Sequence, residues 1–118
     1  MKKALVIDDS ETMRSMASMI LRNLNFDVDA APNGEIGVEK FKSEQYDIVI
    51  TDINMPRLNG IQVIRQVREI NKETPILVLT TESEDSLRKQ GFQEGANGWV
   101  VKPFKSLILA EIVNQLTA

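Results

Sequence analysis

Polar side chains that could bind a metal ion or take part in a reaction follow four short apolar runs of this sequence: Asp8 and Asp9, Asp52, Thr80 and Lys102. Three carboxylates brought together repel one another, and their pKa values rise unless a cation neutralises them. Mg2+ suits such a cluster because it is a hard cation that prefers oxygen ligands. A lysine ammonium and a hydroxyl beside it would add positive charge and a hydrogen-bond donor. Together these groups predict a site for a phosphoryl group.

The apolar runs that precede these residues indicate a parallel β-sheet. Five runs of strand length lie at residues 4–7, 28–31, 48–50, 76–79 and 99–101, and the second is the weakest. Nearly continuous apolarity is typical of strands that are covered on both faces. In an open sheet of this kind the carboxyl ends of the strands meet at one crevice, so the polar residues that follow them are expected to lie together.

Segments with helical spacing separate the strands. The clearest repeats apolar residues every three or four positions from Met13 to Leu24. Another helix is expected over residues 83–94, with Thr81 and Glu84 as a capping box. Five strands alternating with five helices predict an α/β fold, a doubly wound five-stranded parallel sheet in the order 2-1-3-4-5 with the second strand at an edge.

The composition excludes several classes of function. The 118 residues suffice for one domain with its own core, so residues 1–118 are expected to form a single domain. The absence of histidine and cysteine removes thiol nucleophiles, Ser-His-Asp triads and zinc sites built on those ligands. A net charge of −3 with interspersed signs predicts no nucleic-acid partner. The sequence shows no secretory or membrane-spanning segment, so a cytoplasmic protein is expected.

Each polar residue also has an ordinary explanation. An Asp after a strand often caps the next helix, and Thr or Lys at a strand end is commonly a solvated loop residue. Capping accounts for Asp8 or Asp9 but for neither Asp52 nor Lys102. The joint placement of these residues at four strand ends therefore favours the functional interpretation.

Taken together, the residues resemble a known family over the whole chain: the CheY-like receiver domain of two-component response regulators, in its stand-alone chemotaxis form. The resemblance implies the flavodoxin-like fold, a single receiver domain with no effector domain, and signalling by protein contact. The stretches that carry it are VIDDS at 6–10, DIVITDINMP at 47–56, NG at 59–60, TTE at 80–82 and GWVVKPF at 98–104.

The resemblance implies how the acidic residues act. Asp52 would accept a phosphoryl group from a histidine kinase. Asp8 and Asp9 would bind Mg2+ together with Asp52 and the backbone carbonyl of Asn54. The chain would then be a phosphoacceptor signalling protein, which catalyses only its own phosphoryl transfer and dephosphorylation and is not otherwise an enzyme.

The same resemblance assigns roles on the last two strands. Lys102 would pair with the phosphoryl oxygens, and the bond from Lys102 to Pro103 would be cis. Thr80 would be the switch hydroxyl. Trp99 would be the switch aromatic three positions before the lysine, where Tyr or Phe is the usual occupant. Its size also suits a half-buried anchor on an edge strand.

An output surface is expected on the fourth helix, the fifth strand and the fifth helix. Phe92, Trp99, Ile108 and Ile112 would contribute an apolar patch there, with a downstream target such as a flagellar motor switch or a phosphatase as partner, or a second copy of the chain in a homodimer. The alternative is an ordinary margin of the core.

Other classes of protein remain as alternatives. An Mg2+-dependent aspartyl phosphatase carries its nucleophile in an Asp-x-Asp motif, whereas this chain has Asp52-Ile53-Asn54. A flavin carrier requires a hydroxyl- and glycine-rich phosphate-binding loop after the first strand. This chain has the acidic Asp8 and Asp9 at that place, and they would repel phosphate. A phosphorylation-independent interaction module usually has a broken acidic set. Within the receiver family, an intermediate of a different phosphorelay competes with chemotaxis.

Overall fold

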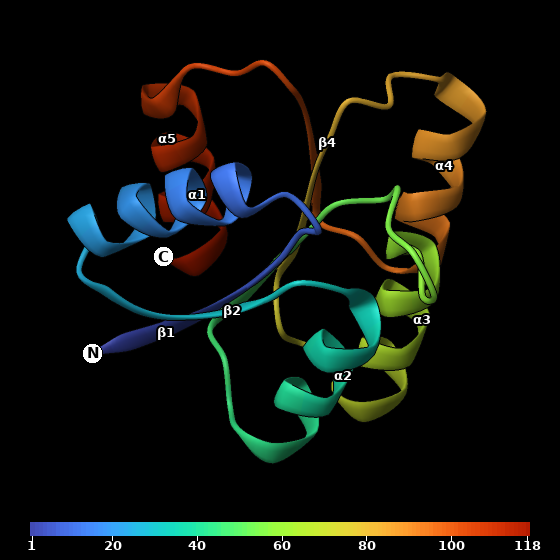
Figure 1. Ribbon diagram of the computed structural model, residues 1–118, viewed down its shortest axis with the longest axis horizontal. Helices are drawn as coiled ribbons and strands as arrows, with labels where there is room; N and C mark the ends of the chain where they lie inside the picture. The colour runs from blue at the N-terminus through green and yellow to red at the C-terminus, as the bar shows by residue number, and fades with distance from the viewer.

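The computed structural model describes residues 1–118 as a parallel β-sheet with helices on both faces (Figure 1). The elements alternate along the chain: β1 (Lys2–Ile7), α1 (Glu11–Asn23), β2 (Phe26–Ala31), α2 (Gly34–Ser43), β3 (Ile48–Thr51), α3 (Gly60–Ile70), β4 (Ile76–Thr80), α4 (Asp85–Glu94), β5 (Gly98–Val101) and α5 (Ser106–Thr117). All neighbouring strands pair in parallel, in the order β2-β1-β3-β4-β5. This confirms the predicted fold class and strand order.

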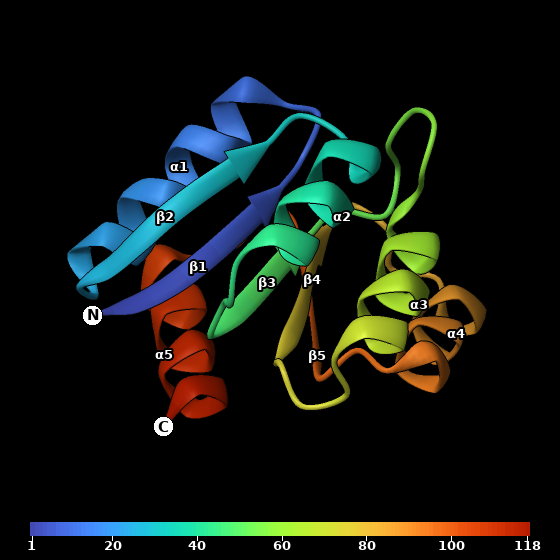
Figure 2. The same ribbon diagram turned by 90° about the horizontal axis from the view of Figure 1, so that it is seen from below.

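The sheet is covered by two groups of helices, because its central strands are apolar on both faces. Figure 2 shows α1 and α5 on one side of the sheet and α2, α3 and α4 on the other. The core accordingly forms two clusters, one between the sheet and α1 and α5, the other between the sheet and α2 and α3. Every residue of β3 and β4 is buried, whereas β2 alternates between buried and exposed residues, as an edge strand does.

The carboxyl ends of the strands are held level by backbone hydrogen bonds that continue the sheet beyond the last paired residues. The Asp8 N–H donates to the Ala31 carbonyl, and the Asp52 N–H donates to the Ile7 carbonyl at 3.0 Å. The Lys102 N–H donates to the carbonyl of Thr80 at 2.7 Å. These bonds fix the backbone positions from which the polar side chains of the predicted site project.

The predicted start of the fourth helix is wrong by two residues, and its predicted capping box does not form. The α4 helix begins at Asp85, and Glu84 at its N-cap position accepts no backbone hydrogen bond with its side chain. The Glu84 carboxylate instead accepts a hydrogen bond from the hydroxyl of Ser86. Residues 81–84 form a loop in which Glu82 is hydrogen-bonded to Thr80, Asn54 and Trp99 and not to the first turn of α4. None of the helices is both long enough and apolar enough to cross a membrane.

Candidate functional site

Three carboxylates meet at the carboxyl ends of β1 and β3. Oxygen atoms of Asp8, Asp9 and Asp52 all lie within 4.8 Å of one another. Asp8 and Asp52 are buried, with 3% and 8% of their surface exposed, while Asp9 is open to solvent. Three carboxylate oxygens at this spacing, one of them accessible from outside, suit a hard divalent cation that keeps several waters. The residues present therefore fit Mg2+.

The start of α1 leaves these carboxylates free for such a role. The helix is capped by Ser10, whose hydroxyl accepts a hydrogen bond from the Met13 N–H. The Ser10 N–H donates to one oxygen of Asp8 at 2.9 Å, and the Arg14 guanidinium donates to the Asp8 carbonyl at 2.7 Å. Ser10 and not Asp8 or Asp9 is therefore the N-cap of α1, and only one oxygen of Asp8 is used in the turn before the helix.

Asp52 is placed by a tight crossing of the loop that follows β3. One of its carboxylate oxygens accepts a hydrogen bond from the Ile53 N–H at 2.6 Å. The backbone of Gly60, at the start of α3, lies so close that a Cβ there would overlap the Asp52 carbonyl oxygen. The Gly60 N–H also donates to the Ile53 carbonyl at 2.9 Å. Glycine at position 60 is therefore needed to close this loop against the end of β3.

Lys102 bridges two of the three carboxylates. Its ammonium lies 2.9 Å from Asp8 and 3.1 Å from Asp52, and all three side chains are almost buried. Burial acts to lower the pKa of Lys102, but the hydrogen bond to Asp8 and the charges of Asp52 and Asp8 outweigh it, so the pKa lies above its usual value. The lysine is therefore a permanent cation beside Asp52. The bond from Lys102 to Pro103 is cis, as the resemblance implies.

The loop after β4 joins this centre to β5 through one residue, Glu82. The hydroxyl oxygen of Thr80, which is fully buried, accepts a hydrogen bond from the Glu82 N–H at 3.2 Å. The Glu82 carboxylate accepts a hydrogen bond from the Asn54 amide at 2.6 Å. The indole N–H of Trp99 donates to the Glu82 carbonyl at 3.0 Å. A movement of this loop is therefore felt at Trp99 as well as beside Asp52.

Sequence reasoning included Glu82 only in the TTE stretch at 80–82 and missed its hydrogen bond from Trp99. The signal was the Trp99 N–H, because a partly buried indole usually finds an acceptor. The role of the Asn54 carbonyl as a metal ligand stays a prediction.

The residues predicted for the output surface divide between the two faces of the sheet. Phe92 and Ile108 are exposed, at 45% and 44%. Trp99 packs against the core cluster under α2 and α3, whereas Ile112 packs against the cluster under α1 and α5. The structure therefore does not join Trp99 and Ile112 in one packed cluster, and their role in output stays a prediction.

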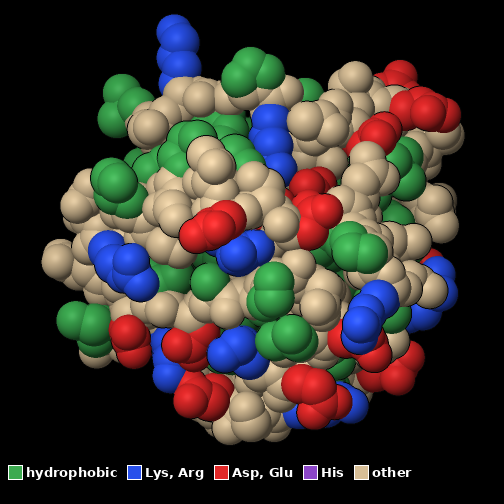
Figure 3. Space-filling view, in the orientation of Figure 1, with side chains coloured by type: hydrophobic (Ala, Val, Ile, Leu, Met, Phe, Trp, Pro, Cys, Tyr) green, Lys and Arg blue, Asp and Glu red, His purple; other side chains and the backbone are tan.

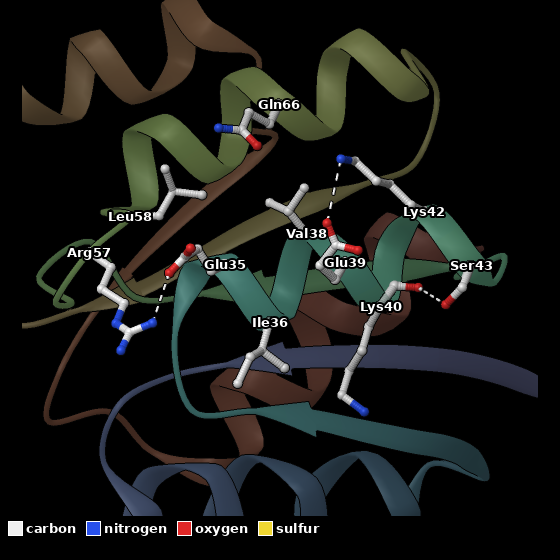
Figure 4. A pocket seen from close by; sticks show the side chains of 10 residues that line it. All are labelled: Glu35, Ile36, Val38, Glu39, Lys40, Lys42, Ser43, Arg57, Leu58 and Gln66. Atoms are coloured by element: carbon white, nitrogen blue, oxygen red, sulfur yellow. Dashed lines mark hydrogen bonds and ion pairs between the residues drawn. The ribbon is translucent and has the colours of Figure 1, made fainter.

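The groove with the largest volume lies away from the acidic cluster. It measures about 840 Å³ and runs between α2 and the loop before α3 (Figure 4). Its rim carries an exposed ion pair between Arg57 and Glu35 at 3.2 Å. In the space-filling view, acidic side chains lie beside a basic one near the centre of the face, where the strands end (Figure 3). The charged cluster, and not the largest hollow, is the candidate site.

The fold and the site together define a class of protein. An open parallel sheet carries, at the ends of its strands, a carboxylate cluster suited to Mg2+, a paired lysine and a buried threonine hydroxyl. This arrangement is suited to receiving a phosphoryl group on a carboxylate. The family model of the response regulator receiver domain matches residues 4–114, so the chain belongs to that family.

Known relatives agree with this assignment. The chain is similar to the transcriptional regulatory protein ResD of Bacillus subtilis, with 41% identity over 86% of this chain and 42% of ResD. It spans less than half the length of the curated relatives it matches first. Among solved structures it is similar to the chemotaxis protein CheY4 of Vibrio cholerae, with a TM-score of 0.93, 36% identity and 98% of each chain covered. The response regulator TrrA of Thermotoga maritima, solved with Mg2+ and beryllofluoride, has a TM-score of 0.90 and 35% identity over 98% of this chain and 99% of that one.

Proposed function

We propose that Asp52 accepts a phosphoryl group from a histidine kinase in an Mg2+-dependent reaction, and that the chain then signals to a protein partner in the cytoplasm through a conformational switch. The observation that carries this proposal is the placement of Asp52 within 4.8 Å of the oxygens of Asp8 and Asp9 and 3.1 Å from the Lys102 ammonium. Phosphoryl transfer depends mainly on positioning and on neutralising the oxygens of the moving group, and these residues supply both.

The transfer uses the chain's own carboxylate as nucleophile. An oxygen of Asp52 forms the new bond to phosphorus, the bond from phosphorus to the donor imidazole nitrogen breaks, and the electron pair stays on that nitrogen. The product is an acyl phosphate. Lys102 then exchanges part of its pairing with Asp52 for the phosphoryl oxygens. Mg2+ held by Asp8, Asp9, Asp52 and the Asn54 carbonyl would neutralise charge on the same oxygens.

Thr80 connects the phosphorylated state to the loop before α4. Its hydroxyl accepts from the Glu82 N–H and retains its own proton, which can be donated to a phosphoryl oxygen. If the hydroxyl turns toward the phosphoryl group, the bond from Glu82 is weakened and the loop shifts. Trp99, bonded to the Glu82 carbonyl, follows that shift, so it serves as the switch aromatic.

The fluorescence of Trp99, the single tryptophan, tests the proposal. We expect Mg2+ to change the emission, and beryllofluoride, which mimics a phosphoryl group, to change it again. Asp52→Asn should keep the folded structure and lose the second response. A second response of native size in Asp52→Asn would show that another residue is the acceptor.

Chemotaxis is the output that we propose, with an intermediate of another phosphorelay as the alternative. This chain covers 98% of CheY4, which is a chemotaxis protein, but only 42% of ResD, which is a transcriptional regulatory protein. Binding of a flagellar motor switch protein or of a phosphatase, strengthened by beryllofluoride, would support the chemotaxis proposal. Transfer of the phosphoryl group from Asp52 onward to a histidine protein would instead support the relay.

The apolar residues Phe92, Trp99, Ile108 and Ile112 are proposed as the contact surface for that partner, formed by α4, β5 and α5. A homodimer through the same elements is the competing use of the surface. Sedimentation with and without beryllofluoride separates the two, because only the dimer raises the mass in the absence of a partner. We expect neither DNA binding nor turnover of an external phosphate ester, and measured turnover would favour the aspartyl phosphatase.

A further inference from the structure

The indole of Trp99 lies against a position of α4 where no side chain fits. A Cβ atom at Gly91 would be 2.7 Å from Cζ3 and 3.3 Å from Cε3 of the indole. Atoms closer than about 3 Å overlap, so even alanine at this position would push the ring away or shift the helix. Gly91 is the only buried residue of α4.

Glycine is otherwise a poor choice for this position. It lies in the interior of α4, where glycine is the least favourable residue after proline because it loses the most backbone freedom. Its backbone angles are helical, since Gly95 is the only glycine of the chain with a positive φ. Neither a turn nor a left-handed conformation therefore accounts for Gly91. The close approach of Trp99 does.

A hydrogen bond holds the Trp99 indole at a second point, away from its contact with Gly91. The indole N–H donates to the Glu82 carbonyl at 3.0 Å, on the loop before α4. The ring can satisfy this bond only while its six-membered part rests on Gly91, since both contacts belong to one rigid ring. The tie to Glu82 and the seat on Gly91 therefore hold the indole in one position.

We propose that Gly91 is a positioning residue for Trp99: it provides a seat for the larger indole where a receiver usually carries Tyr or Phe, and so makes the bond to Glu82 possible. The inference rests on the proposed function in one respect, the use of Trp99 as the switch. It adds that the seat and the indole act as a matched pair. A side chain at position 91 then displaces the indole from this seat, whatever the state of Asp52.

Gly91→Ala tests the seat without any phosphoryl mimic. We expect the emission of Trp99 to shift to longer wavelength and its quenching by acrylamide to increase, because the ring leaves its seat and loses the bond to Glu82. Gln93→Ala is the matched control, since Gln93 is an exposed residue of the same helix. Native emission and quenching in Gly91→Ala would overturn the proposal.

Stability in a second background keeps the test decisive if Gly91→Ala folds poorly. A Trp99→Phe chain lacks the indole whose six-membered ring would clash with a side chain at position 91. In that chain Gly91→Ala should raise the folding equilibrium constant by about fivefold, because alanine has the higher helix propensity. In the native chain the same substitution should lower it. Destabilisation of similar size in both backgrounds would show that Gly91 has a role unrelated to Trp99, and would overturn the proposal.

The experiment separates this inference from the proposed function. The seat is measured in protein without Mg2+ or beryllofluoride, and the switch is measured by the loss of the beryllofluoride response in Asp52→Asn. A failed response to beryllofluoride with a displaced indole in Gly91→Ala would refute the switch and keep the seat. The reverse pair of results would refute the seat and keep the switch.

Discussion

Lys102→Met removes the cation that holds Asp8 and Asp52 together while keeping a side chain of similar length. In the native chain the ammonium lies 2.9 Å and 3.1 Å from these carboxylates, and the lysine side chain is 11% exposed. After the substitution two nearly buried carboxylates face each other with no positive partner. The repulsion and the lost hydrogen bonds both act against the folded state.

The expected loss of stability is large for a single substitution. Removing one partner of a buried ion pair costs about 3 to 5 kcal/mol, and because Asp9 opens the cluster to solvent we expect the lower value, about 3 kcal/mol. With an unfolding entropy of about 2.1 cal/mol/K per residue, a chain of this length should lose about 12 °C in Tm. Mg2+ should recover part of the loss, since it supplies the missing positive charge.

Thermal unfolding followed by circular dichroism, with and without Mg2+, measures both effects. Removal of a unit positive charge about 4 Å from a divalent ion gains roughly 2 kcal/mol in Mg2+ binding even at the dielectric constant of water, so affinity should rise about thirtyfold. Lys105→Met is the control, because Lys105 is exposed and forms no ion pair. Lys102 does not bridge the two carboxylates if Lys102→Met has the same Tm as Lys105→Met and the same Mg2+ affinity as the native chain.

Three further perturbations probe other parts of the structure. Burial and the hydrogen bond donated to Asp29 raise the pKa of Tyr46, so the phenol stays protonated in the folded chain above pH about 10, where it ionises in the unfolded chain. The Tm should therefore fall as pH rises through this range, and Tyr46→Phe should remove this pH dependence. Tyrosinate absorbance from this single tyrosine at pH about 10 in the folded protein would contradict the assignment. Arg68 donates hydrogen bonds to backbone carbonyls at the end of α4 and before β4, so Arg68→Met should cost about 2 kcal/mol in denaturant unfolding, and a loss below about 0.5 kcal/mol would show that solvent replaces these bonds. Asn54→Ala breaks the bond to the Glu82 carboxylate and should change the lifetime of the phosphorylated state without preventing phosphorylation, as measured by decay of the labelled protein; an unchanged lifetime would separate this bond from the reaction centre.

The sheet was predictable because its signal is local and repeated. A polar residue directly follows each of four apolar runs. The runs at 4–7, 48–50, 76–79 and 99–101 accordingly fall inside β1, β3, β4 and β5. The weak run at 28–31 falls within β2, whose alternating burial explains its weakness. Once these strands are parallel, chain topology alone brings Asp8, Asp9, Asp52 and Lys102 together.

The features that escaped prediction depend on contacts between distant segments. The loop before α4 is held by hydrogen bonds from Asn54 and Trp99 to Glu82, which no pattern within residues 81–85 reveals. The helix propensity of Gly91 predicts a weak helix, but its contact with the indole exists only after β5 and α4 have packed. Propensity describes one segment, whereas both of these features belong to pairs of segments.

The most direct test of the central claim is to identify the phosphorylated residue. We expect that incubation with Mg2+ and phosphoramidate, a small donor with a phosphorus–nitrogen bond, adds one phosphoryl group to the intact chain, and that borohydride trapping followed by peptide mass spectrometry places it on Asp52. Asp52→Asn should remain unmodified, and removal of Mg2+ with a chelator should abolish the reaction. Modification of the Asp52→Asn chain at the native rate, or the absence of modification in the native chain with Mg2+ present, would contradict the account.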